Sequence, residues 1–184
     1  MSKVIQCQTL DGRPIAFIDE VIGSGAMKDV YFSPDKSYVV CFFSKEKNHF
    51  YQSQAELERQ KDRLKEIVGN KWQGIFNGAG GDYWKNVFCW PDGLVEYNGL
   101  LGITAPTYQK PFFFEFGSKN NDFLGIKGKE KEGKWFASAN NQNRFLDERE
   151  KGTWLNYLKI CILIARAVRR MHAAGLAHSD LSYK

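Results

Sequence analysis

The chain has 184 residues, of which 43% are hydrophobic and 15% aromatic, and its formal net charge is +5. This length and composition are typical of a folded protein of one domain or slightly more, and they exclude a disordered chain. The modest charge, with Lys and Arg spread among Asp and Glu, does not require a nucleic-acid partner.

Cysteine spacing and hydropathy predict the compartment. The four cysteines, Cys7, Cys41, Cys89 and Cys161, form no C-x-x-C pair, so we predict neither a metal site nor a disulfide framework. The N-terminus lacks the pattern of a signal peptide. The apolar stretch 155–168 is interrupted by polar residues and is too short to cross a bilayer. We therefore expect a cytoplasmic protein that does not enter a membrane.

The first part of the sequence predicts β-structure. Apolar runs over 4–10 and 14–22 flank Asp11-Gly12, which is a strong signal for a hairpin. A turn over 33–36 then leads into a strand over 38–43. Strands joined by such short turns predict an antiparallel sheet and argue against a dinucleotide-binding βαβ unit.

The middle of the chain predicts one helix and more strands. Residues 50–68 form an amphipathic pattern that Gly69-Asn70 is expected to end. A second hairpin is expected from runs over 87–90 and 94–97. A further strand is expected over 100–104, before Pro106.

The last part predicts a connection and a long helix. Residues 117–151 are mainly Lys, Asn, Gly and Glu, which favours a long, mostly exposed connection with one short helix at most. Apolar residues then recur at helical spacing over 153–174, with Thr153 as the N-cap and Gly175 as the stop.

Two motifs resemble those of the protein-kinase superfamily. The segment 22–30, I-G-S-G-A-M-K-D-V, resembles the glycine-rich loop G-x-G-x-x-G-x-V, and the segment 171–181, M-H-A-A-G-L-A-H-S-D-L, resembles the approach to the catalytic loop. The order of expected elements is also similar to that of a kinase small lobe and the opening of the large lobe.

The resemblance implies a fold and a domain division. The fold would be α+β: a kinase-like small lobe, with a twisted antiparallel five-stranded sheet and one helix, followed by a hinge, a linker and the first long helix of the large lobe. The small lobe with its N-terminal hairpin would span 1–108, the linker or insert 109–152, and the truncated start of the large lobe 153–184.

The resemblance also implies where a nucleotide binds. The implied positions come from the glycine turn, two strands and the hinge: Gly23, Ser24, Gly25, Lys28, Val30, Val39, Cys41, Thr104, Ala105 and Thr107. Glycines let the backbone approach phosphates closely, although glycines also occur in ordinary β-turns without a ligand. Thr104 would stand near the gatekeeper position, and the backbone over 105–107 would meet the adenine edge.

The sequence departs from the family pattern at two related positions, one in the glycine turn and one in the third strand. Lys28 stands where the family has its third glycine, and Cys41 stands where the third strand carries lysine. This resembles the with-no-lysine kinases, and a flexible lysine stem can bring its charge to the phosphates from a neighbouring strand. The alternative is a solvated Lys28 and a buried structural Cys41. A register that ends on Lys45 is rejected because it fills the adenine space with Phe43.

The resemblance further implies three catalytic residues. Asp180 would accept the proton of the acceptor hydroxyl, and Lys28 would hold the phosphates. Glu56 of the first helix would pair with that lysine, with Glu58 as the alternative. The family's arginine before the aspartate is replaced by Ser179, which argues against control by a phosphorylated activation loop.

The implied function is that of the ATP-binding part of a bacterial, eukaryotic-type protein kinase that phosphorylates Ser or Thr of a protein substrate. ATP and Mg²⁺ would be the cofactors, but the magnesium ligands would lie beyond residue 184, so we expect the chain alone to be inactive. One alternative is a pseudokinase or nucleotide-responsive scaffold. Another is a small-molecule, aminoglycoside-type phosphotransferase, since Ser182 replaces the usual lysine. A third is a basic module that binds RNA or an acidic partner through 119–134, a kind of charged run that is usually a solvated loop.

Overall fold

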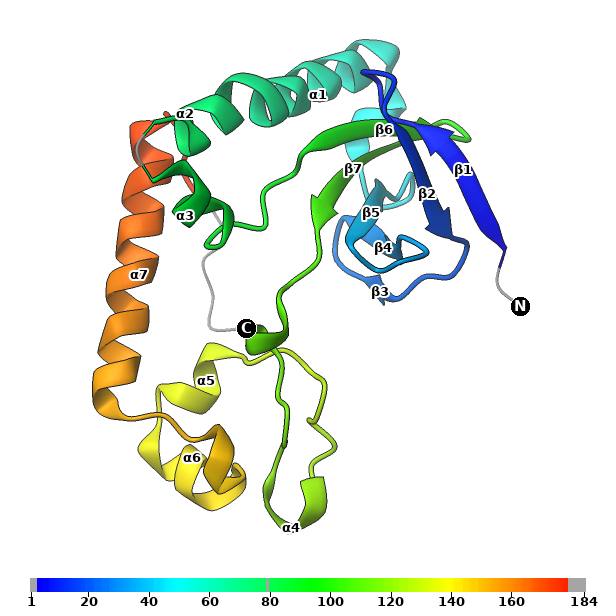
Figure 1. Ribbon diagram of the computed structural model, residues 1–184. Helices are drawn as coiled ribbons and strands as arrows, with labels where there is room; N and C mark the ends of the chain where they lie inside the picture. The colour runs from blue at the N-terminus through cyan, green and yellow to red at the C-terminus, as the bar shows by residue number, and fades with distance from the viewer. Residues whose placement is uncertain (1–2, 79, 179–184) are drawn as a thin grey trace. The chain divides into compact units, whose positions relative to one another are not determined.

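An antiparallel β-sheet forms the centre of the N-terminal part of the protein (Figure 1). The computed structural model describes residues 3–78 and 80–178, and the chain divides into two units, Met1–Thr107 and Tyr108–Lys184. The sheet has the strand order β3-β4-β5-β7-β6, and every neighbouring pair is antiparallel. Its strands are β3 (Gly23–Ser24), β4 (Lys28–Phe32), β5 (Tyr38–Phe43), β6 (Gly93–Tyr97) and β7 (Leu100–Pro106). The expected α+β class and antiparallel sheet are confirmed.

The expected N-terminal hairpin is also confirmed. Strand β1 (Val4–Gln8) pairs with β2 (Pro14–Ile18). The second strand ends at Ile18 and not at Ile22, because the Glu20 N–H donates to the Ile18 carbonyl at 2.7 Å and turns the chain. The Tyr38 hydroxyl accepts from the Ala16 N–H and donates to the Ala16 carbonyl, both at 2.9 Å. This pair of bonds attaches the free edge of β2 to the sheet.

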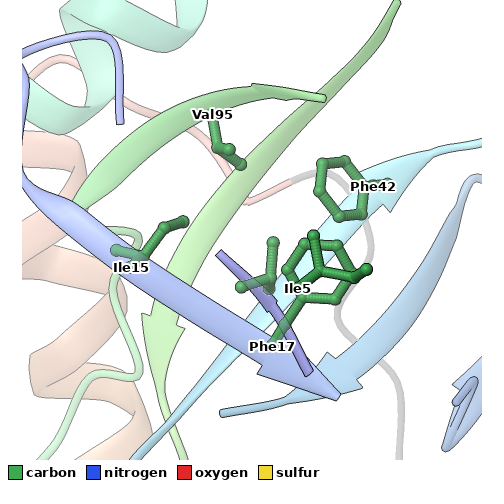
Figure 2. Close-up of a cluster of buried hydrophobic side chains, with 6 residues drawn as sticks. Ile5, Ile15, Phe17, Phe42 and Val95 are labelled. Atoms are coloured by element: carbon green, nitrogen blue, oxygen red, sulfur yellow. The ribbon is translucent and has the colours of Figure 1, made fainter. Parts of the chain in front are cut away.

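The hairpin covers one face of the sheet. Figure 2 shows its apolar side chains meeting those of the sheet, and the buried members are Ile5, Ile15, Phe17, Val40, Phe42 and Val95. The rings of Phe17 and Phe42 meet edge to face, with centroids 5.3 Å apart. Full burial of one such side chain contributes about 1.5–3 kcal/mol. The hairpin is therefore part of the core and not an appendage.

Helix α1 (Gln54–Glu66) contributes to the core on the opposite face. It begins at Gln54 because the Ser53 side chain accepts the Glu56 N–H, and the residues before it form the 3₁₀ turn η1 (His49–Gln52). The buried residues of this second core are Cys41, Phe43, Leu64, Leu94, Leu101 and Ile103.

The predicted end of this helix is wrong. The chain does not stop at Gly69-Asn70 but passes through a π-type turn, η2 (Ile67–Lys71), into α2 (Trp72–Phe76), and α3 (Gly81–Lys85) follows. The Trp90 indole N–H donates to the Ile67 carbonyl at 3.0 Å. This bond gives a carbonyl in the wider π turn a partner from outside the helix.

The second predicted hairpin is wrong as well. Residues 87–90 form no strand, and the hairpin instead joins β6 to β7 through Asn98 and Gly99. Both turn residues have positive φ, 50° and 69°. Asn-Gly is the preferred pair for such a two-residue turn, so the signal was present in the sequence and was overlooked.

The C-terminal unit contains a small core of its own. Phe114, Ile126 and Leu146 are buried, with Trp135 and Phe136 packed against them. The segment 117–151 is mostly exposed, as predicted, but it contributes to a small core and carries more short helices than the one expected. The short elements of this unit are η3 (Lys110–Phe112), α4 (Lys119–Asp122), α5 (Gly133–Phe136), α6 (Ala139–Phe145) and η4 (Glu148–Glu150).

The buried side chain of Glu150 connects two other segments of this unit. Its carboxylate accepts the Phe116 N–H at 2.6 Å and pairs with Lys131 at 3.0 Å. Burial acts to raise the pKa of Glu150, but the Phe116 amide and the Lys131 ammonium outweigh it and hold the pKa below its ordinary value. Glutamate is usually found on the surface, but Glu150 is buried and its charge is paired with that of Lys131.

The long C-terminal helix is confirmed. Helix α7 (Trp154–Ala173) is capped by Thr153, whose side chain accepts the Asn156 N–H, and Gly175 follows it with φ of 72°. No helix in the described part of the chain is both long and apolar enough to span a membrane.

Asp122 closes the loop that carries α4. Its Oδ1 accepts the backbone N–H groups of Ser118 and Ile126 at 2.9 and 3.0 Å, and Oδ2 accepts that of Lys127 at 2.9 Å. The Ser118 amide, with the other two donors, outweighs burial and lowers the pKa of Asp122 to about 2. The charged form is therefore the one that holds the loop.

We predict that this loop loosens in acid. Because the pKa of Asp122 is lower in the folded chain, the carboxylate stabilises the loop fully above about pH 4, and the effect is lost as pH falls through about 2. Asp122→Asn should accelerate amide exchange at Ser118, Ile126 and Lys127 at neutral pH. Asp62→Asn, on the surface of α1, is the control and should leave these rates unchanged. Equal rates in both variants would contradict the role of Asp122.

Candidate functional site

The glycine turn connects β3 and β4. The Gly25 N–H donates to the Lys28 carbonyl and the Ile22 N–H to the Val30 carbonyl, both at 2.9 Å. A Cβ at Gly23 would meet no atom within 4 Å, and one at Gly25 would meet only the Lys28 carbonyl oxygen, at 3.8 Å. Neither crowding nor positive φ requires glycine at these positions, so internal packing does not explain them.

Strand register brings four of the implied nucleotide positions onto one face. Val30 lies opposite Cys41, and Lys28 lies opposite Phe43. Side chains directly opposite each other share a face, and alternate residues of a strand return to it. Lys28, Val30, Val39 and Cys41 therefore lie on the face that α1 covers in part, opposite the hairpin face.

The side chain of Lys28 reaches toward Cys41. Its Nζ lies 5.6 Å from the centre of the Phe43 ring. Burial raises the pKa of the Cys41 thiol, whereas the nearby Lys28 ammonium acts to lower it. The charge of Lys28 thus acts on the thiol of Cys41, the residue that the resemblance would align with a strand lysine. Within the described part of the chain, no carboxylate forms an ion pair with Lys28.

Thr104 lies on the other face, which corrects its expected place. It pairs with Val40, whose side chain faces the hairpin. Its hydroxyl donates to Asp92 at 2.6 Å and accepts from Arg13 at 3.0 Å. The Arg13 guanidinium also pairs with Asp92 at 3.1 Å. Thr104 therefore fastens the hairpin to the sheet, and its neighbours in β7 are the ones that share a face with Cys41 and Val39.

The two implied hinge positions differ. Ala105 lies opposite Val39 and so shares its face. The Thr107 N–H donates to the Ser37 carbonyl at 3.3 Å, and the Thr107 hydroxyl donates to the Lys36 carbonyl at 3.1 Å. Thr107 is therefore engaged by the turn between β4 and β5, and only the Ala105 position is left as expected.

The two candidate glutamates of α1 have different surroundings. Glu58 is exposed, accepts from Gln54 at 2.7 Å and pairs with Lys61 at 3.1 Å. Lys61 also pairs with Glu96 of β6 at 2.7 Å. Glu56 is half-buried, and its carboxylate forms no ion pair within the described residues. Glu56 is thus the candidate still free to pair with another cation.

Lys45 is well placed for a structural role only. It follows the end of β5, its Nζ lies 6.0 Å from the centre of the Tyr51 ring, and a Cβ on Gly99 would lie 3.1 Å from that Nζ. It therefore lies beside the β6–β7 turn.

Two residues at the glycine turn were missed by the sequence reasoning. Lys47 donates to the Ser24 hydroxyl at 2.9 Å, and Asn48 donates to the Met27 carbonyl at 2.7 Å. Neither belongs to a motif, and no signal in the sequence brings the segment after β5 back to the turn.

The residues that the resemblance assigns to the catalytic loop, Ser179, Asp180 and Ser182, lie outside the described residues. Among the residues described, no group of three or more His, Cys, Asp or Glu side chains could hold a metal ion. We therefore derive no step through a metal.

Comparison with protein-family models, curated proteins and solved structures found no match to this chain. The case for a function therefore depends on the geometry of the N-terminal unit.

We predict that Lys28 controls the reactivity of Cys41. Lys28→Met removes the charge that lowers the pKa of this thiol, so less thiolate forms and iodoacetamide should alkylate Cys41 more slowly at pH 8. Mass spectrometry of each cysteine gives the rates. Lys45→Met is the control, since its ammonium lies beside Tyr51. A Cys41 rate that is the same in both variants would show that the Lys28 charge does not reach the thiol.

Proposed function

We propose that the N-terminal unit binds ATP beneath the glycine turn, as part of a protein kinase that transfers the γ-phosphate to a Ser or Thr hydroxyl of a protein. The observation that carries the proposal is the position of Lys28. It stands on the same face of the sheet as Val30 and Val39, which offer an apolar surface to a base, and as Cys41.

Electrostatics favours Lys28 as the phosphate-binding cation. Its ammonium is half-buried, lies over an aromatic ring and is not neutralised by a described carboxylate. At 4 Å an ammonium and a phosphate charge attract by about 4 kcal/mol at an effective dielectric constant of about 20. The phosphates of a bound nucleotide would supply the negatively charged partner that the Lys28 ammonium lacks among the described residues.

The topology of the sheet gives separate support. Helix α1, followed by the short helices α2 and α3, lies in chain order between the third and fourth strands of the sheet, β5 and β6. It packs on the face that carries Cys41. This is the order expected of a kinase-like small lobe, in which one face of the sheet serves both the helix and the nucleotide.

The remaining roles follow from the sequence resemblance. Asp180 would accept the proton of the acceptor hydroxyl. Bound Mg-ATP would supply the phosphoryl group and its charge neutralisation. A kinase of this type would act in the cytoplasm on a protein substrate.

A pseudokinase is the second candidate, and a specific observation favours it. The resemblance would put Cys41 at the strand-lysine position, and within the described residues neither Glu56 nor Glu58 forms an ion pair with Lys28. In active kinases a lysine–glutamate pair is in place. ATP binding without phosphoryl transfer to any protein would select this candidate.

We predict that Lys28→Met weakens Mg-ATP binding to this chain. The loss of the only proposed phosphate cation should raise the dissociation constant at least about tenfold, or ~1.4 kcal/mol. Isothermal titration calorimetry measures it, and Lys45→Met should bind as the wild type does. Equal affinity in the two variants, or a wild-type chain that binds no Mg-ATP, would refute the proposed site.

We also predict that the two glutamates of α1 differ in their effects. If the nucleotide draws Lys28 toward α1, Glu56→Gln should weaken Mg-ATP binding severalfold, because a charged partner is lost. Glu58→Gln should have little effect, since Glu58 already pairs with Lys61. The reverse ranking would assign the partner role to Glu58, and no effect in either would favour the pseudokinase.

A further inference from the structure

The segment that follows β5 returns to the outer side of the glycine turn. Lys47 Nζ donates to the Ser24 hydroxyl at 2.9 Å and to the Gly25 carbonyl at 3.1 Å. It also lies 3.6 Å from a carboxylate oxygen of Asp29. The Ser24 hydroxyl in turn donates to Asp29 at 2.6 Å. One ammonium therefore joins three groups of the turn.

Asn48 makes a second connection from the same segment. Its side-chain amide donates to the carbonyls of Met27 and Ser44, both at 2.7 Å. Asn48 is only 5% exposed, so these bonds are shielded from water and hold the far side of the turn firmly. Two consecutive side chains, Lys47 and Asn48, thus fix two backbone carbonyls of one turn.

Strand register places Lys47 and Lys28 on opposite sides. Ser24 of β3 lies opposite Asp29 of β4 and so shares its face. Asp29 stands between Lys28 and Val30 in β4, so its side chain points to the other face from theirs. Because Lys47 binds Ser24 and Asp29, it lies on the outer face of the turn. Lys28 lies on the inner face, with Val30.

The bond to Lys47 also sets the direction of one amide. In a trans peptide the carbonyl and the following N–H point in opposite directions, and the described chain has no cis peptide. The Gly25 carbonyl is directed at Lys47, so the Ala26 N–H points away from it, toward the side of Lys28. That N–H donates no hydrogen bond within the described residues.

We propose that Lys47 is a positioning residue for phosphate binding. It holds the Gly25–Ala26 peptide so that the Ala26 N–H and the Lys28 ammonium face the same phosphate. It also neutralises Asp29, whose carboxylate would otherwise repel that phosphate from the next residue in the strand. This role deepens the proposed ATP-binding function and rests on it.

The first test needs no nucleotide. Amide exchange of the full chain is measured by NMR for the wild type, Lys47→Met and Lys45→Met. Loss of the Lys47 bonds should speed exchange at Gly25 about tenfold, whereas Lys45→Met should leave it unchanged. Thermal unfolding establishes that all three chains are folded. An unchanged Gly25 rate in folded Lys47→Met would overturn the proposal.

The second test separates phosphate binding from general destabilisation. Lys47→Met should weaken Mg-ATP binding about fivefold but leave adenosine binding unchanged, because only the phosphates meet the turn. Lys47→Arg should restore most of the affinity. Adding Asp29→Asn to Lys47→Met should restore part, since the unpaired carboxylate is then removed.

The outcomes distinguish this inference from the function on which it rests. Wild-type binding of Mg-ATP with equal affinity in Lys47→Met would overturn the role of Lys47 and leave the proposed function intact. Equal losses for ATP and adenosine would also overturn it, as they would indicate only a damaged fold. A wild-type chain that binds no Mg-ATP would refute the proposed function, while faster Gly25 exchange would still show that Lys47 holds the turn.

Discussion

Strand β5 is buried on both of its faces, and this constraint organises the N-terminal unit. Val40 and Phe42 point to the hairpin, while Cys41 and Phe43 point to the α1 side. A strand with two covered faces cannot slip by one residue, because every side chain would then exchange environments. The same register sets Lys28 opposite Phe43. The position of Lys28, the proposed phosphate-binding cation, is therefore a consequence of how the neighbouring strand β5 packs in the core.

Charge is distributed unevenly around the glycine turn. The outer face holds a neutral pair, Asp29 with Lys47, whereas the inner face holds an ammonium that no described carboxylate neutralises. A surface ion pair such as the outer one contributes little to stability. Its effect is to cancel a negative charge where an anion would approach. The two lysines thus have different physical roles although both lie at the glycine turn.

Local signals in the sequence identified most of the N-terminal elements. Asp11-Gly12 and the turn over 33–36 gave the correct hairpin and the correct strand β5, because both signals depend on neighbouring residues. The predicted position of Thr104 is wrong by one face, since the face depends on the long-range pairing of β7 with β5. Buried Glu150 could not be foreseen, because its partner Lys131 is distant in the sequence. Long-range pairing of polar groups leaves no periodic pattern to recognise.

The β1–β2 hairpin has a practical consequence for defining the smallest part of the protein that folds. The hairpin supplies three of the six buried side chains of the core that contains Val40 and Val95, both fully inaccessible to solvent. A version of the protein trimmed to begin at the glycine turn would expose the rest of that core to water and invite aggregation. The glycine motif at 22–30 comes only after this hairpin, so a domain boundary drawn at that motif would cut through a core.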